Sequence, residues 1–457
     1  MMRKNILLFV CGCVLFGCST SKKATNNSKN VQIVEDQNPG LPVPLVLKHG
    51  VPVYSAAKIN YKRADKTLFN IQFGEPVVVS TASKPEKWGF FQFPKIGYKQ
   101  NGLLQVKWNM KPDAMSAYGM DNFGSAYSAN GGKTWTLQEK DEITPDVILL
   151  NGDRLQIFTP KPIKTDSLNM PKPLLTGAST DTYNTKTVYN YYRLNDLPAN
   201  CQAVYIKRLK KGATEWKDEQ DKLYDPNAAR HTTKGLLPVV WWGDMHVASD
   251  GSVIAGIYPG SLIRANGTID PKSGVFFYRS TDNGHSWHIQ GRIPYYPDTL
   301  ADVKGNKRMG FTEPAFEILK DGTFLCITRT TDGVGIGPMY ASYSKDMGKT
   351  WTRPQAISAN GVLPHLLQLE NGVVVLCSGR PGVQLRFSAN GKENTWTQPF
   401  EMLPFENEKD EVSCGYTELI PTGKDTFLMV YSDFKYKTPE GNIRKAIKVR
   451  QVTIKSN

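Results

Sequence analysis

Short runs in which apolar and polar residues alternate recur along the chain, for example GVFFYRS at 274–280 and VQLRFS at 383–388. A period of two places successive side chains on opposite faces of a β-strand. Other apolar segments are joined by Asp321-Gly322 or Asn371-Gly372, dipeptides that are typical of tight hairpins. No segment sustains a helical period. The pattern therefore predicts an all-β chain.

An octet that begins with Ser and ends with Trp recurs among these strands. It reads SANGGKTW at 128–135, STDNGHSW at 280–287 and SKDMGKTW at 344–351, and SANGKENTW at 388–396 fits with one inserted residue. Asp or Asn at the third position can hydrogen-bond its own backbone, and Gly can adopt positive φ. Trp can then anchor the turn to the body of the protein. Four such octets predict a repeating β architecture.

These octets resemble the Asp-box, or bacterial neuraminidase repeat, of the sialidase superfamily. The resemblance implies a six-bladed β-propeller of four-stranded antiparallel blades, and a seventh blade from the stretch at 41–82 is the alternative. The long gap between the first two boxes must hold blades without a box. The segment at 239–260, VVWWGDMHVASDGSVIAGIYPG, has the strand, turn, strand pattern of one of them.

The N-terminal residues resemble an export signal. Arg3 and Lys4 precede an apolar stretch that is shorter than the roughly 20 residues needed to span a bilayer, so we expect a signal peptide at 1–17. Leu15-Phe16-Gly17-Cys18 resembles a bacterial lipobox, which implies a lipid on Cys18; ordinary secretion with an incidental cysteine is the alternative. We expect a flexible tether at 18–40, the propeller at 41–457, and a bacterial cell-envelope location on the periplasmic or surface face of the outer membrane.

The composition excludes several classes of function. The net charge is +14, but Lys and Arg form no dense run, so we expect no nucleic-acid partner. The four cysteines after Cys18 show no metal-ligand spacing, and three of them lie in or next to apolar runs, where a free Cys is usually buried. We therefore expect no disulfide framework, no metal and no cofactor.

The sialidase resemblance implies a Tyr nucleophile, a Glu that activates it, and arginines that bind the carboxylate of the substrate. A neutral phenol suits an anionic sugar, which would repel a carboxylate nucleophile. Tyr416, in SCGYTEL, and Glu313, in FTEPAFEIL, match the nucleophile and its base. Arg329 ends the strand that follows Glu313. Arg380 lies eight residues before its Asp-box and is favoured over Arg386 as the next arginine of the clamp.

Two further positions come from the N-terminal part of the propeller. The acid/base Asp should lie in the loop before the first box, NMKPDAMSAYGMDNFGSAYS at 109–128, where Asp113 is preferred and Asp121 is the alternative. The family strand that carries the first arginine reads Arg-x-Pro, and here Gln92 precedes Phe93-Pro94. Because Gln carries no charge, the carboxylate clamp is incomplete in this chain.

We expect an exported retaining exo-glycosidase that releases a terminal sialic acid or a related acidic sugar from glycans, acting as a monomer. The first alternative is a carbohydrate-binding propeller without catalysis, and the second is a propeller glycosidase that acts on a different sugar. A third possibility is chemistry at a histidine such as His246, beside Asp244, or His49.

Overall fold

The computed structural model describes residues 31–36, 49–139, 142–180, 186–238, 242–270, 272–331, 337–392, 395–407 and 409–456. Within these ranges the chain consists of β-strands, loops and short 3-10 turns, which confirms the predicted all-β class. The 3-10 turns are η1 (Met115–Ala117), η2 (Leu194–Asp196), η3 (Ala199–Cys201) and η4 (Gly305–Lys307). No helix among the described residues is long and apolar enough to cross a membrane.

The predicted signal peptide and Cys18 lie outside the described residues. The predicted tether at 18–40 differs from the structure at one place, because β1 (Val31–Glu35) pairs in parallel with β3 (Ala57–Arg63). Ordered structure therefore begins before residue 41. The polar residues around 18–40 favour a tether, but pairing with β3, a strand from farther along the chain, holds Val31–Glu35 in a sheet.

Three sheets are each built mainly from four strands that follow one another in the chain and pair antiparallel. The first is β6 (Phe90–Tyr98), β7 (Leu104–Met110), β8 (Phe123–Ser128) and β9 (Thr136–Gln138). The second is β23 (Gly310–Ile318), β24 (Phe324–Thr331), β25 (Met339–Ser344) and β26 (Gln355–Ser358). The third is β27 (Val362–Gln368), β28 (Val374–Gly379), β29 (Val383–Ser388) and β30 (Phe400–Glu401), with β2 (Val51–Pro52) beside β30.

A larger sheet contains two more groups of this kind. One is β10 (Val147–Ile148), β11 (Arg154–Ile157), β15 (Ala203–Leu209) and β16 (Lys217–Tyr224). The other is β19 (Trp242–Val247), β20 (Val253–Leu262), β21 (Gly274–Ser280) and β22 (Ser286–Ile293). The antiparallel pairing of β19 with β20 confirms the strand, turn, strand prediction for 239–260. Parallel pairing between β16 and β22 joins the two groups.

An inserted set of strands extends the larger sheet on the β20 side. It comprises β12 (Ile163–Lys164), β13 (Leu175–Thr180), β14 (Lys186–Arg193), β17 (Ala228–Thr233) and β18 (Leu236–Leu237). Strand β17 pairs with β20 through Ala228 and Ala229. No sequence pattern predicted this extension, because its pairing partners are far apart in the chain.

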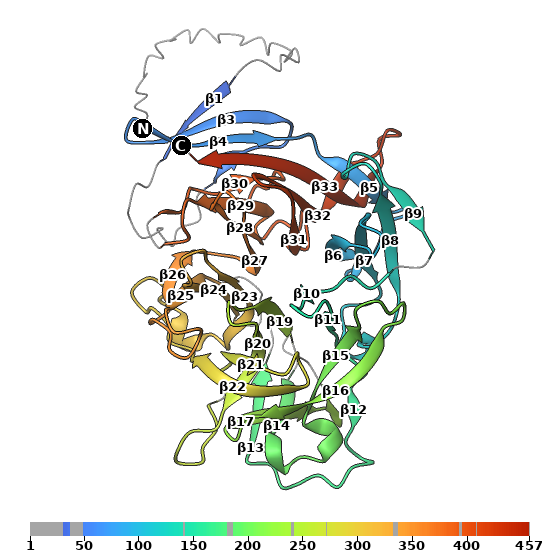
Figure 1. Cartoon of the computed structure of the whole chain (residues 1–457), viewed down its shortest axis with the longest axis vertical. Coiled ribbons are helices and arrows are strands. Elements are labelled where there is room, and N and C mark those ends of the chain that lie inside the picture. Colours follow the sequence, from blue (N-terminus) through green and yellow to red (C-terminus); the bar gives the residue numbers. More distant parts are fainter. Residues whose placement is uncertain are drawn as a thin grey trace, which may run out of the picture.

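The two ends of the described chain share one sheet (Figure 1). Strands β31 (Thr417–Gly423), β32 (Thr426–Lys437) and β33 (Ile443–Ser456) pair with β4 (Lys66–Phe73) and β5 (Val77–Thr81) through β33. Strand β3 continues the sheet beyond β4. Within the described part of the stretch at 41–82, β3, β4 and β5 thus join the sheet of the C-terminal strands, β2 joins that of β30, and no separate sheet forms.

The Asp-box turns fold as their sequences predict. In the second box the Ser280 hydroxyl accepts the backbone N–H of Gly284 at 2.8 Å, and Asp282 accepts the N–H of Ser286 at 2.9 Å. Burial alone would raise the pKa of Asp282, but hydrogen bonds from the Ser280 and Ser286 hydroxyls and from the Ser286 N–H outweigh it and bring the pKa to about 2. The Trp287 side chain is fully buried, and its indole N–H donates to the Gly284 carbonyl at 3.0 Å. This turn is therefore fixed to its sheet.

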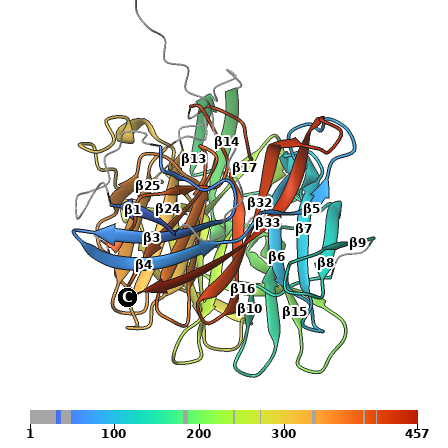
Figure 2. The same cartoon turned by 90° about the horizontal axis from the view of Figure 1, so that it is seen from above.

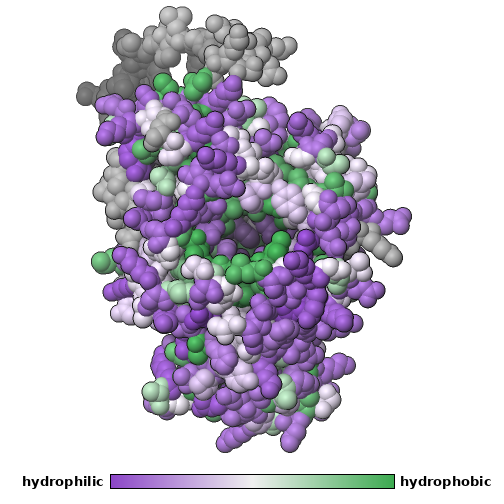
Figure 3. Space-filling model, viewed as in Figure 1, coloured by the Kyte–Doolittle hydropathy of each residue, from purple (hydrophilic) through white to green (hydrophobic). Residues whose placement is uncertain are grey.

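The hydrophobic core lies between neighbouring sheets and not in the middle of the molecule. One cluster joins Val106 and Trp108 of β7 to Leu428 and Val430 of β32. The four described cysteines, Cys201, Cys326, Cys377 and Cys414, are buried and free. The first strands of neighbouring groups contact one another, as β31 does with β6 and with β27, and β23 does with β27 and with β19. The sheets therefore surround a middle region. Figure 2 shows the sheets from the side, and Figure 3 shows that the surface is hollowed at the middle.

Candidate active site

Tyr416 stands directly before β31, and its side chain is half-buried. Its hydroxyl donates a hydrogen bond to Oε1 of Glu313, which lies on β23. Glu313 has a φ of 48°, and the pairing of β23 with β24 shifts register between Thr312 and Ala315. This irregularity re-aims the Glu313 side chain. The structure therefore brings together the predicted nucleophile and its predicted base across two sheets.

Glycines allow the chain to approach closely at this point. A side chain on Gly379 would lie 2.1 Å from the Cα atom of Gly415, and Gly415 itself has a φ of 80°. Neither position tolerates a Cβ atom without displacement of the backbone. Because Arg380 follows Gly379 and Tyr416 follows Gly415, this approach brings the two side chains side by side.

Three donors hold the Glu313 carboxylate. Besides Tyr416, the Arg329 guanidinium donates to Oε1 at 2.6 Å and the Leu363 backbone N–H donates to Oε2 at 2.8 Å. Burial alone would raise the pKa of Glu313, but the charge and hydrogen bonds of Arg329, with the bond from Tyr416, outweigh it, so the pKa lies below its usual value. Glu313 is therefore ionised in the resting site.

Arg329 is itself buried, with 7% of its surface exposed. Burial opposes its charge, but Glu313 outweighs burial and raises the pKa of Arg329 above its ordinary value. Its Nε atom has no hydrogen-bond partner among the described residues. The guanidinium thus stays charged in the resting site, and its Nε is a buried donor without a partner in the described part of the chain.

Burial and the Glu313 carboxylate raise the pKa of Tyr416 well above 10, while Arg329 and Arg380 act in the opposite direction. Tyr416 is therefore a neutral phenol at rest. Proton transfer from Tyr416 to Glu313 is unfavourable in the resting site, because the Tyr416 phenol is a weaker acid than the Glu313 carboxyl group. The pair can react only if the proton moves as the phenolic oxygen forms a new bond.

Arg380 lies beside Tyr416, whereas Arg386 does not contact it. The Arg380 guanidinium carbon is 5.8 Å from the centre of the Tyr416 ring, and its Nε donates to the Cys414 carbonyl at 3.0 Å. Arg386 is buried within β29, where its Nη2 donates to Ser358 at 3.3 Å. Burial lowers the pKa of Arg386 to about 10. Of the two alternatives, the geometry favours Arg380.

The two candidate acid/base aspartates occupy different surroundings. Asp113 is exposed, and its Oδ2 accepts the indole N–H of Trp88 at 2.9 Å. The Arg380 guanidinium lies 5.4 Å from the centre of the Trp88 ring, so Trp88 links Asp113 to the Tyr416 cluster. Asp121 instead interacts electrostatically with Lys111. The geometry favours Asp113.

Gln92 is fully buried, and both of its amide atoms lack hydrogen-bond partners among the described residues. Its neighbours Phe91 and Phe93 have φ values of 54° and 51°, and the Phe93 ring packs 4.9 Å from that of Tyr416. The strand carrying Gln92 therefore reaches the site. A buried amide without hydrogen-bond partners costs about 1–3 kcal/mol. Such groups are rare in folded proteins and are explained most simply by a functional role.

A model of the BNR repeat-like domain matches residues 163–429. This chain belongs to that family. No curated protein matches the sequence.

Several solved structures resemble this member of the BNR repeat-like family. A protein of unknown function from Dyadobacter fermentans is 18% identical, with a TM-score of 0.54, and the match covers 84% of this chain and 99% of that one. An α-L-arabinanase from Penicillium chrysogenum is 17% identical, with a TM-score of 0.44 and coverage of 82% and 98%. The sialidase of Trypanosoma rangeli is 14% identical, with a TM-score of 0.40 and coverage of 89% and 59%. At these identities the first match supports a shared fold.

Sequence reasoning missed the aromatic residues that surround the site. Trp88 lies 25 residues before Asp113, and the register of the β6–β7 hairpin, which pairs Phe90 with Met110, brings the two together. Tyr258, on β20, interacts electrostatically with Glu313, Tyr416 and Arg329. The only signal in the sequence was the abundance of aromatic residues near strand ends.

The histidines singled out by the sequence lie in other surroundings. The Nδ1 atom of His246 is 3.8 Å from a carboxylate oxygen of Glu317, while Asp244 accepts the backbone N–H of Phe316 at 3.0 Å. His49 stacks on Phe405 and lies 3.6 Å from Glu401. Within the described part of the chain, no hydrogen bond, ion pair or ring contact joins either histidine to Tyr416.

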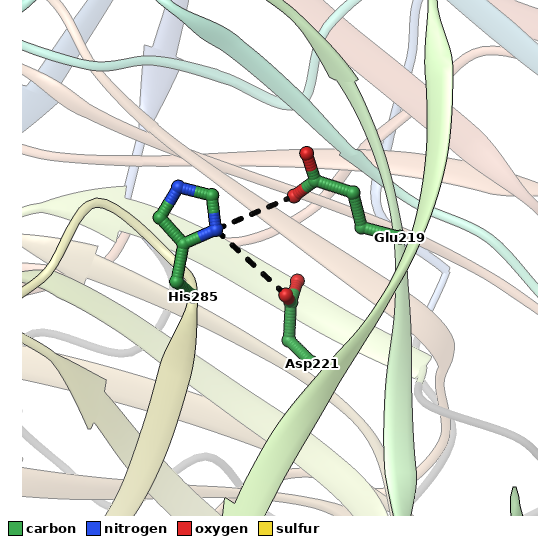
Figure 4. A group of neighbouring side chains, drawn as sticks. All are labelled: Glu219, Asp221 and His285. Carbon is green, nitrogen blue, oxygen red and sulfur yellow. Dashed lines mark ion pairs between the residues drawn. The ribbon is translucent and has the colours of Figure 1, made fainter.

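Glu219, Asp221 and His285 are the described residues whose donor atoms could together hold a metal ion (Figure 4). These atoms lie within 4.8 Å of one another. The buried guanidinium of Arg208 already donates to Glu219 at 2.7 Å and lies 3.5 Å from Nδ1 of His285. Since a cation already occupies this position, the cluster is better described as a network of ion pairs.

Proposed function

We propose that this protein is a retaining exo-glycosidase of the sialidase type, built as a six-bladed β-propeller. The blade count is supported by the groups of four antiparallel strands, with the N-terminal strands completing the sheet of the C-terminal ones. The observation that carries the proposal is the hydrogen bond of Tyr416 to the ionised, Arg329-paired carboxylate of Glu313. A tyrosine that only packs in a sheet needs neither partner.

In the proposed reaction Tyr416 attacks the anomeric carbon while its proton passes to Glu313. Asp113, held by Trp88 at 2.9 Å, protonates the leaving oxygen and later activates the water that releases the sugar. Phenolate character that develops on Tyr416 is stabilised by the nearby charges of Arg329 and Arg380.

The substrate carries an acidic group in this proposal, because the positive charges of Arg329 and Arg380 both act on Tyr416. Gln92 can donate a hydrogen bond but supplies no charge. The proposed substrate is therefore a terminal sialic acid or a related acidic sugar. Its carboxylate would be bound by two cations, Arg329 and Arg380, and not by three. The proposal includes export, with Cys18 as the lipid anchor, and a glycan as the partner.

The test is hydrolysis of fluorogenic glycosides of sialic acid, glucuronic acid and L-arabinofuranose by the wild type and by Tyr416→Phe. We expect release from an acidic sugar by the wild type and its loss in Tyr416→Phe. Hydrolysis that persists in Tyr416→Phe would contradict the proposed nucleophile. Hydrolysis of the arabinofuranoside alone would remove the acidic sugar from the proposal.

A second candidate function is glycan binding without catalysis, and Gln92 is the observation that favours it, since it stands where the related clamp has an arginine. Binding on a glycan array without any product detected by mass spectrometry would support this alternative.

A further inference from the structure

A cavity of about 330 Å³ adjoins the candidate active site. Tyr258 lines it and interacts electrostatically with Glu313 and Tyr416. Tyr118 also lines it and interacts with Asp113. Met115, two residues after Asp113, lines it as well, so the cavity lies beside the loop that carries the proposed acid/base.

The far wall of this cavity comes from the inserted strands and not from the repeating groups. Strand β14 contributes Thr187 and Tyr189, and β17 contributes Ala228 to His231 and Thr233. Tyr189 packs edge-on against His231, with ring centres 5.4 Å apart. The insertion thus builds a recess with aromatic walls beside the site.

The charged residues that line the recess are basic. They are Arg230 and Lys234, and no Asp or Glu is among the lining residues. Burial and the neighbouring Arg230 lower the pKa of His231 to about 4, so this histidine is neutral at pH 7. Asp225, which accepts the hydroxyl of the lining Tyr278, is already paired with Arg292. The recess therefore complements an anionic group.

The size and the position of the recess limit what it can bind. A volume of about 330 Å³ is at the lower end of small-molecule sites, which suits one sugar unit better than a chain. An acid/base must face the leaving oxygen, and Tyr118 interacts with Asp113. The recess therefore lies on the leaving-group side of the scissile bond.

We propose that this recess is a second sugar subsite, which binds the unit next to the scissile bond and selects one that carries a carboxylate or a sulfate. Tyr189 and Tyr258 provide the aromatic surfaces, and Arg230 and Lys234 provide the charge. The proposal rests on the proposed glycosidase function, since it takes the scissile bond to lie between Tyr416 and Asp113.

Binding is measured in the Tyr416→Phe background, so that turnover does not interfere. A glycan array with neutral, sulfated and uronic-acid oligosaccharides identifies the ligand, and calorimetry measures the dissociation constant. Lys234→Gln should weaken binding of the acidic glycan about fivefold at low salt and leave its neutral analogue unchanged. Tyr189→Ala should weaken binding of both by about tenfold. Lys345→Gln, an exposed lysine in an Asp-box turn, is the matched control and should change neither.

The outcomes separate this proposal from the proposed function. Glycan binding that depends on Lys234 and Tyr189, in a wild type that hydrolyses nothing, would sustain the subsite and refute the glycosidase. Hydrolysis by a wild type whose KM is unchanged by both substitutions would refute the subsite and sustain the glycosidase. A Tyr416→Phe variant that binds no glycan on the array would overturn the subsite. The sulfated and uronic-acid ligands show which anion is selected.

Discussion

Replacing Glu313 with Gln removes the charge that holds the site together. The carboxylate is 7% exposed and accepts Arg329 at 2.6 Å and Leu363 at 2.8 Å, as well as the Tyr416 hydroxyl. A Gln amide can still accept one of these bonds, but Arg329 is then left as a buried cation without its anion. Removal of one partner from a buried ion pair costs about 3–5 kcal/mol, and the loss of a general base costs about 10²–10⁴-fold in rate.

Two assays are needed to separate these effects. Urea unfolding followed by Trp fluorescence gives the free energy of unfolding, and hydrolysis of the substrate found above gives kcat. The double variant Glu313→Gln/Arg329→Gln should be less destabilised than the sum of the two single variants, because it leaves no unpaired charge. A Glu313→Gln protein as stable as the wild type, or additive free energies in the cycle, would refute the assignment of a stabilising buried pair.

Three further predictions follow from the same contacts. Tyr416→Phe should lose more than about 10³-fold in kcat and change the free energy of unfolding by only about 1 kcal/mol, since one hydrogen bond is removed; both are read in the assays above. Asp113→Asn should lower kcat and flatten the acidic or basic limb of the pH profile, whereas Asp121→Asn should leave the profile unchanged, and the reverse result would exchange their roles. Burial and the neighbouring Glu219 raise the pKa of Asp221 to about 7, so the folded protein holds this proton more tightly than the unfolded chain and loses stability as the pH rises from about 4 to 7. Asp221→Asn should be more stable than the wild type at pH 8 and equal to it near pH 4, as urea unfolding at both pH values would show; equal stability at both would count against the raised pKa.

Local patterns predicted much of the fold and the chemistry of the site. Alternation and hairpin dipeptides predicted the strands, and the Asp-box octets predicted turns whose Asp282 and Trp287 contacts are seen in the structure. These features are predictable because strand periodicity and turn hydrogen bonds involve residues that are close in the chain. The tether at 18–40 was wrong for Val31–Glu35, since their partner β3 begins more than 20 residues later.

The sequence by itself determined which residue types were present and in which order, from Asp113 to Tyr416, and so defined a set of candidates. Only the tertiary structure separated Arg380 from Arg386 and Asp113 from Asp121. Those choices depend on which arginine reaches Tyr416 across a sheet boundary, and on which aspartate reaches Trp88 at the open end of the β6–β7 hairpin. The bond between Glu313 and Tyr416 joins residues 103 positions apart. Contacts of that kind arise from the packing of whole sheets, which no local period records.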